Sequence, residues 1–358
     1  MNSHTKIKYN RQCGMTLLEL MVAIAIGSIL LAGLASTFIS SSRAQRELTK
    51  SGNLIENGRY AIGVLQEDLR HSGFFGYYYD LGVSTGVLPD PCTTTMATID
   101  SNMIQPLSGY NAANSSTRAN ISSTTCGSLM TNANLNPGSD VLSTMRADTE
   151  AVTTTTQYDV YLQANSYDKT VFAGTGSTPA SYYLKYPTKT GNTTVAETRQ
   201  MHVNTYFVAP CVIGNGTDGV CDGSENEQTP TLKRLELSTD GSATKITIKP
   251  LVEGVEYFKV LYGIDSSPST TNDVTKEPGD GIPDSYVASP STAEWPNVVS
   301  VKIYLLVRAD KKTDDHTDTK TYSLAGSTFG PFNDQYKRHV FTTEVRLINI
   351  SDRREIPE

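Results

Sequence analysis

The sequence lacks the short motifs of the common catalytic and nucleotide-binding sites. It contains no Gly-x-Ser-x-Gly, no P-loop and no His-Glu-x-x-His. Its five histidines are scattered, and no Cys-x-x-Cys is present, which argues against a zinc site. Basic residues are also in deficit, with 30 Lys and Arg against 37 Asp and Glu. We therefore expect neither enzymatic activity nor direct binding of nucleic acid.

Short polar stretches near the C-terminus do not change this view. The basic clusters Lys337-Arg338-His339 and Arg353-Arg354 contain only two or three residues each. We interpret both as solvated surface. Residues 310–320 are rich in Asp, Lys and Thr, and we interpret them as an exposed loop.

One long apolar segment interrupts the otherwise polar chain. Between Met15 and Ile39 the single charged residue is Glu19. About 20 apolar residues in a helix suffice to cross a bilayer, and a charge near the centre of such a span costs about 3 kcal/mol. The preceding segment has no acidic residue and three basic ones, Lys6, Lys8 and Arg11. This charge pattern predicts an N-terminus on the cytoplasmic side.

The order of features around Gly14 resembles the class III signal of type IV prepilins and of type II secretion pseudopilins. A basic leader is followed by Gly14, one apolar residue, Thr-Leu-Leu-Glu and the apolar run; Met15 stands where the family usually has Phe. The resemblance implies that a prepilin peptidase cuts between Gly14 and Met15 and methylates the new amine. It also implies that the apolar helix first anchors the protein in the inner membrane and then packs into the core of a fibre.

Glu19 would need a cationic partner in such a fibre core. The amine of Met15 on a neighbouring subunit is the strongest local candidate. This pair would set the axial register, because an unpaired buried charge is heavily penalised. The alternative is an ordinary single-pass anchor that tolerates Glu19 near the membrane interface.

Cysteine usage is consistent with export. Loss of the leader would remove Cys13, leave four cysteines and lower the net charge from −7 to −10, because the leader has three basic residues and no acidic ones. An even number of cysteines in an oxidising compartment predicts two disulfides. Three pairings are possible. We favour Cys92–Cys126 and Cys211–Cys221, since each pair brackets a loop-like polar stretch; the alternative is that some are buried thiols.

We predict an α+β fold in which a long N-terminal helix packs on an antiparallel β-sheet head with large loop and strand insertions. The helix should end near Gly73, a plausible C-cap. Its second half carries apolar residues at helical spacing, which should face the head: Leu48, Ile55, Ile62, Leu65 and Leu69. Later segments alternate as half-buried strands, most clearly Val299, Val301, Ile303, Leu305 and Val307.

Four segments resemble the PilW group of minor pilins. One is the helix end, 65–76, and the others are 252–265, 295–308 and 338–349. The expected domains are a leader (1–14), a helix (15–75, with 15–39 as transmembrane segment and fibre core) and a β-rich head (76–358). Within the head we expect a variable insert at 80–230 and a family-like sheet core at 231–358.

The resemblance implies a minor pilin, a structural subunit that initiates or assembles a type IV pilus in a tip or priming complex. Its expected partners are other minor pilins, the major pilin, a tip adhesin, the prepilin peptidase and the inner-membrane assembly platform. The head would lie in the periplasm and later at the cell surface. Two alternatives stay open: a type II secretion pseudopilin, and an anchored adhesin or DNA-uptake receptor.

An acidic turn near residue 280 is a candidate calcium site. Asp280 and Asp284 flank a Gly-Ile-Pro turn, and calcium prefers six to eight oxygen ligands. Asp265, Asp273 or Glu277 would have to complete the shell. The alternative is an acidic surface turn with no bound ion, and we expect no other cofactor.

Overall fold

The computed structural model describes most of the chain, namely residues 14–78, 81, 84, 86–121, 124–166, 168–177, 185–187, 193–214, 219–225, 228–266 and 279–352. The chain divides into two compact units, Met1–Lys50 and Ser51–Glu358. Residues 1–13 of the leader, including Cys13, and the possible calcium ligands Asp273 and Glu277 lie outside the described residues.

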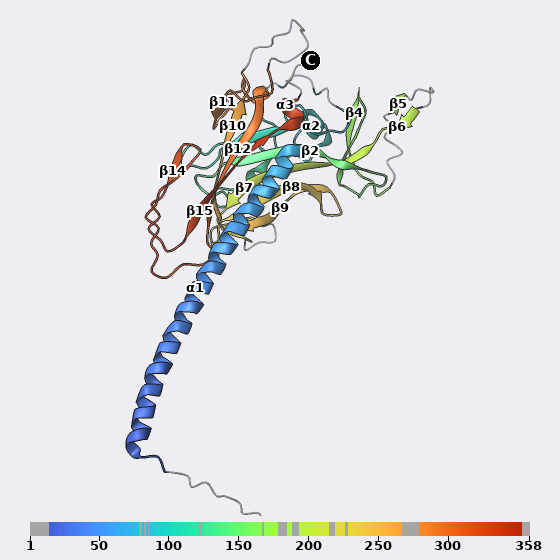
Figure 1. The fold of residues 1–358 in the computed structure, drawn as a ribbon. Helices are drawn as coiled ribbons and strands as arrows, with labels where there is room; N and C mark the ends of the chain where they lie inside the picture. Colours follow the sequence, from blue (N-terminus) through green and yellow to red (C-terminus); the bar gives the residue numbers. More distant parts are fainter. Residues whose placement is uncertain are drawn as a thin grey trace, which may run out of the picture. The chain divides into compact units, whose positions relative to one another are not determined.

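The helices are few and one dominates (Figure 1). They are α1 (Leu17–His71), α2 (Met96–Asn102) and α3 (Ile348–Ser351), with short 3-10 turns at Thr125–Ser128 and Trp295–Asn297. Helix α1 ends at His71, which confirms the end predicted near Gly73. Gly73 has a φ of +77°, a left-handed conformation that glycine adopts without strain and that commonly ends helices.

Two antiparallel sheets form the second unit (Figure 1). The seven-stranded sheet has the order β1 (Leu107–Tyr110), β2 (Val141–Val152), β7 (Thr198–Ala209), β3 (Val160–Ala164) and β4 (Lys169–Ala173), with β8 (Thr231–Thr239) paired to β7 and β9 (Thr244–Glu253) paired to β8. The four-stranded sheet has the order β11 (Ser285–Val287), β10 (Val255–Ile264), β12 (Val298–Arg308) and β15 (Arg338–Arg346). Separate hairpins are β5 (Lys185–Pro187) with β6 (Thr193–Val195), and β13 (Tyr322–Leu324) with β14 (Ser327–Phe329).

The α+β architecture expected from the sequence is therefore present. The predicted boundary at residue 230 does not coincide with a sheet boundary, because β8 and β9 extend the sheet that contains β7. The domain division as a whole stays a prediction.

The C-terminal half of α1 packs on a core to which both sheets contribute. Its buried apolar residues are Leu54, Ala61, Leu65 and Leu69, spaced by seven, four and four residues. Two of them, Leu54 and Ala61, were not in the predicted stripe, whereas Ile55 and Ile62 are only partly buried against the core. Gly58 lies on the same face, where a Cβ atom would meet the Phe341 ring at 2.1 Å. A glycine here lets helix and strand approach closely.

Strand β12 is more buried than its sequence predicts. The expected face, from Val299 to Val307, is inaccessible, and Leu306 on the opposite face is inaccessible too. Leu306 packs with Leu324 and Phe329 of the β13–β14 hairpin. The strand was predicted to be half-buried, but it lies between β10 and β15 and is covered on its second face by a chain segment that periodicity cannot foresee.

Candidate functional site

The N-terminal end of α1 holds the predicted processing segment. Gly14, Met15 and Thr16 precede the helix, which begins at Leu17. The backbone N–H of Thr16 donates to a Glu19 carboxylate oxygen at 3.1 Å, and the backbone N–H of Glu19 donates to the Thr16 hydroxyl at 3.2 Å. This reciprocal pair is a capping box, which satisfies two N–H groups that a helix start leaves without partners.

Thr16 is thus a functional candidate that the sequence reasoning missed. The signal was present as Thr-x-x-Glu before an apolar run, which is the sequence signature of a capping box. This geometry allows Glu19 to act in two ways. Its carboxylate stabilises the helix start within one chain, and its negative charge stays available to a cation on a neighbouring chain. Cleavage after Gly14, methylation of Met15 and the register role of Glu19 stay predictions.

The apolar half of α1 is exposed along its length. Leu18 is 72% exposed, Leu31 68% and Phe38 73%. Among the described residues, α1 is one helix that is long and apolar enough to cross a membrane, by length and composition. So large an exposed apolar surface marks a segment that lipid or other protein chains cover.

A buried carboxylate joins the last turns of α1 to the seven-stranded sheet. Asp68 is 5% exposed and accepts hydrogen bonds from Arg146 Nε at 2.8 Å, Asn204 Nδ2 at 3.0 Å and the Tyr206 hydroxyl at 3.1 Å. Thr144 donates to the same group. Burial raises the pKa of Asp68, but the hydrogen bonds from Arg146 and Thr144 outweigh it and hold this pKa below its ordinary value. Asp68 therefore anchors the helix as an ionised group.

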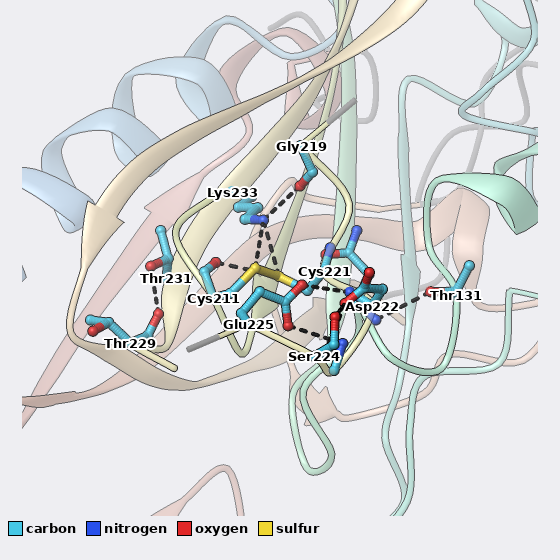
Figure 2. The surroundings of a disulfide bond; sticks show 12 residues. Thr131, Cys211, Gly219, Cys221, Asp222, Ser224, Glu225, Thr229, Thr231 and Lys233 are labelled. Atoms are coloured by element: carbon cyan, nitrogen blue, oxygen red, sulfur yellow. Dashed lines mark hydrogen bonds between the residues drawn. A yellow bond between two sulfur atoms is a disulfide. The ribbon is translucent and has the colours of Figure 1, made fainter. Parts of the chain in front are cut away.

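Both predicted disulfides are present, Cys92–Cys126 and Cys211–Cys221. Figure 2 shows the second one with the buried Lys233, whose Nζ lies 3.3 Å from Cys221 Sγ and donates to the Gly219 carbonyl at 2.7 Å. Glu225 also lies within 4.8 Å of both sulfur atoms. The sulfurs are bonded to each other and offer no thiolates, so this group is a cross-link and not a metal site.

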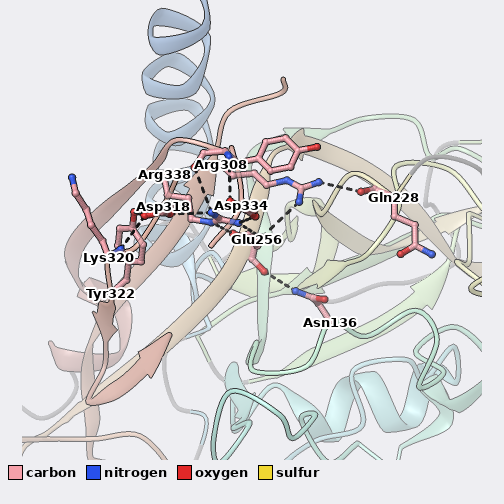
Figure 3. Close-up of polar contacts among 10 residues, drawn as sticks. Asn136, Gln228, Glu256, Arg308, Asp318, Lys320, Tyr322, Asp334 and Arg338 are labelled. Carbon is pink, nitrogen blue, oxygen red and sulfur yellow. Dashed lines mark hydrogen bonds and ion pairs between the residues drawn. The ribbon is translucent and has the colours of Figure 1, made fainter. Parts of the chain in front are cut away.

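Within the basic cluster at 337–339, Arg338 has a structural role, whereas Lys337 is partly exposed and His339 is exposed. The Arg338 side chain is 1% exposed, so its interpretation as solvated surface is wrong. Its guanidinium donates to Glu256 at 2.6 Å, Asp318 at 2.9 Å and Asp334 at 2.7 Å, as Figure 3 shows. It also lies 3.8 Å from the centre of the Phe332 ring. This one side chain ties β10 to the segment between β12 and β15.

Residues 310–320 form a loop that is mostly exposed, as expected, but two of its side chains are buried. Thr313 is 6% exposed and Asp318 2% exposed, although their neighbours Asp314 and Lys320 are exposed. The Tyr322 hydroxyl donates to both Asp318 carboxylate oxygens, at 3.1 and 3.0 Å. Arg353 and Arg354 lie outside the described residues.

The predicted calcium ligands lie in a turn that binds its own backbone. The Asp265 carboxylate accepts from the Gly281 N–H at 2.9 Å, and Asp280 accepts from the Ile282 N–H at 2.9 Å. Asp284 accepts from Ser266 N–H and hydroxyl at 2.8 and 2.9 Å. In the part of the chain that the structure describes, Asp280 and Asp284 do not join a third acidic, Cys or His side chain in a group compact enough to hold an ion. Calcium binding stays a prediction.

Comparisons with known protein families find matches in two separate segments of the chain. Residues 9–35 match the family described as "Prokaryotic N-terminal methylation motif", and residues 212–349 match "Type IV Pilus-assembly protein W". No curated protein matches the sequence. A solved type IV-like pilin from Thermus thermophilus is 19% identical, covers 42% of this chain and 79% of its own, and has a TM-score of 0.21, a value at which the likeness carries no argument. The chain thus carries an N-terminal methylation motif and, over residues 212–349, a segment similar to the type IV pilus-assembly protein W family.

Proposed function

We propose that the protein is a minor pilin that initiates type IV pilus assembly from a tip or priming complex. The observation that carries the proposal is the combination, in one chain, of the N-terminal methylation motif with a pilus-assembly protein W segment in the head. A large head supports a tip position, because bulky heads repeated along a shaft would be hard to pack helically. Other minor pilins, the major pilin and a tip adhesin are its proposed partners.

The proposed location is the inner membrane, followed by the pilus at the cell surface. The basic leader supports a cytoplasmic N-terminus. Two disulfides support a head that folds in the oxidising periplasm. A prepilin peptidase would cut after Gly14, and the assembly platform would then extract the apolar helix into the fibre.

We infer that the Glu19 carboxylate is required for incorporation of the protein into the fibre. Cleavage would expose the Met15 amine, whose ordinary pKa of about 7.7–8.0 leaves it mostly protonated at neutral pH. An ammonium that loses its carboxylate partner inside a packed helix bundle costs about 3–5 kcal/mol. Removal of the Glu19 charge should therefore abolish incorporation into the fibre, while cleavage and membrane insertion continue.

The capping box makes a matched comparison possible. Glu19→Gln keeps a side-chain acceptor for the Thr16 N–H but removes the charge, whereas Thr16→Ala keeps the charge and removes the hydroxyl cap. The proposal expects Glu19→Gln to be cleaved and inserted but absent from sheared pili, and Thr16→Ala to be incorporated at reduced yield. Normal incorporation of Glu19→Gln would contradict the register role.

A deletion strain tests the filament type. Loss of surface pili and twitching, with normal exoprotein secretion, is the expected result. Loss of secretion with normal pili would instead identify a type II secretion pseudopilin. Gold labelling of the head on isolated pili tests the position, and even labelling along the shaft would contradict a tip complex.

A further inference from the structure

A buried lysine lies where the two sheets of the head meet. Lys259, on β10 of the four-stranded sheet, is 1% exposed. Its Nζ donates to Asn111 Oδ1 at 2.8 Å, to the Ala112 carbonyl at 2.8 Å and to Asp140 Oδ1 at 2.5 Å. Asn111 follows β1 and Asp140 precedes β2, two strands of the seven-stranded sheet that pair at Tyr110 and Val141.

The Asp140 carboxylate is held in place from both sheets. It is 2% exposed, and it accepts from the Ala112 N–H at 2.8 Å and from the Val260 N–H at 2.9 Å. Its own backbone N–H donates to the Phe258 carbonyl at 2.8 Å. These bonds leave the carboxylate little freedom to rotate, so it faces Lys259 with a fixed geometry.

We propose that Lys259 forms an intramolecular isopeptide bond with Asn111, with Asp140 as the proton carrier. A lysine amine that contacts both an amide carbonyl and a buried carboxylate brings together the three groups that this reaction requires. The amine is the nucleophile, the Asn111 side-chain carbon is the electrophile, and the carboxylate moves protons between them.

The step balances without an oxidant or a co-reactant. The Lys259 ammonium passes one proton to Asp140, and the resulting amine attacks Cγ of Asn111. A Cγ–N bond to Lys259 forms, and the Asn111 Cγ–Nδ2 bond breaks. Asp140 protonates the departing nitrogen and takes up the proton that the new amide nitrogen loses, so that ammonia leaves.

Burial favours the first proton transfer. A charged ammonium and carboxylate are both disfavoured where water is excluded, so a neutral amine beside a carboxylic acid becomes accessible. Burial raises the pKa of Asp140 above its ordinary value even though Lys259 opposes the shift. Asn111 is only half-buried, which opens a route for ammonia to solvent.

The geometry places the reacting groups close to an attack position. Nζ lies 2.8 Å from Oδ1, the oxygen bonded to the carbon that is attacked. Rotation of the Asn111 amide about its Cβ–Cγ bond turns a face of the carbonyl group toward the amine, the direction from which a nucleophile attacks. Groups held about 3–3.5 Å apart in this way gain much of the rate advantage of an intramolecular reaction.

The bond would link the two sheets covalently across a sequence separation of 148 residues. Hydrogen bonds and side-chain packing would then no longer be the sole links between β1 and β10. Such a link resists mechanical and thermal separation of the sheets, and it requires no oxidising compartment.

Mass spectrometry of the full mature chain tests the proposal. After reduction and denaturation, the mature wild-type chain should be lighter by one ammonia than the cleaved and methylated sequence, and a digest should contain one branched peptide that joins the Asn111 and Lys259 segments. Lys259→Met and Asp140→Ala should restore the full mass. Lys302→Met, on neighbouring β12, should keep the deficit, because Lys302 is partly exposed and pairs with Glu344.

Three results would overturn the proposal, and the wild-type peptide map alone decides each of them. The first is full mass with linear Asn111 and Lys259 peptides. The second is a branched peptide that has lost water and joins Asp140 to Lys259. The third is an ammonia loss at another asparagine while the Lys259 peptide stays linear.

Discussion

Replacement of Arg338 by methionine should strongly destabilise the head. The guanidinium contacts three carboxylates, and two of them are largely inaccessible: the Asp318 side chain is 2% exposed and that of Glu256 10%. Methionine keeps much of the aliphatic volume but leaves these charges without their main partner. Removal of one partner from a buried ion pair costs about 3–5 kcal/mol, and we expect a loss in that range.

The fluorescence of Trp295 provides the assay. It is the one tryptophan of the chain, is 5% exposed and lies 4.8 Å from the Tyr262 ring in the main core. Urea unfolding of the detergent-solubilised protein should report the loss as a shift of the midpoint. At a slope of about 2–3 kcal/mol per molar urea, the expected decrease is roughly 1–2 M.

Arg346 on the same strand is a matched control. Its side chain is 50% exposed and its ion pair with Asp352 spans 3.6 Å. Exposed pairs of this kind contribute no more than about 1 kcal/mol, so Arg346→Met should shift the midpoint little. Arg338→Lys keeps the charge without the planar fork and should lie between the two. Equal midpoints for Arg338→Met and Arg346→Met would refute the reasoning.

Three further predictions concern the helix, its anchor and the acidic turn. Gly58→Ala should destabilise the head because the new Cβ would clash with the Phe341 ring of β15. Gly63→Ala has open space around it and should stabilise the helix by about 0.5–1 kcal/mol. Urea midpoints that shift in the same direction for both variants would contradict this prediction. The pKa of Asp68 in the folded protein lies below its ordinary value of about 3.9, so the ionised carboxylate stabilises the fold above that pH. This stabilisation is lost as the pH falls through the folded pKa, and the stability deficit of Asp68→Asn should therefore shrink on acidification. A deficit independent of pH would contradict an ionised anchor. If Asp280 and Asp284 bind calcium, millimolar calcium should raise the melting temperature of the wild type but not of the Asp280→Ala/Asp284→Ala variant; no shift in the wild type would end that prediction.

The sequence alone determined the features that depend only on residues close to one another along the chain. The basic leader, Gly14 and the apolar run after Met15 predict a processed, membrane-compatible helix, because charge and hydrophobicity there are local properties. The end of the helix at Gly73 is local too. Both disulfide pairings could be predicted, since each pair encloses a loop between residues close in sequence.

The tertiary structure alone decided which polar groups are buried. Arg338 lies in a short basic cluster that resembles solvated surface, and Asp318 lies in a stretch rich in charges. Both are inaccessible because a hairpin folds over the four-stranded sheet, while Glu256 of β10 in that sheet contacts Arg338. A single sequence gives no signal for such contacts, because the partners lie far apart along the chain.

The same reason applies to the groups that carry our further inference. Lys259 is separated by 148 residues from Asn111 and by 119 residues from Asp140, and nothing in the local sequence of the three residues connects them. Hydrophobic periodicity specifies which face of a strand is buried, but it does not specify which strands of different sheets meet. The N-terminal segment therefore predicts how the chain is anchored and assembled, while the folded head brings together the side chains that join its two sheets.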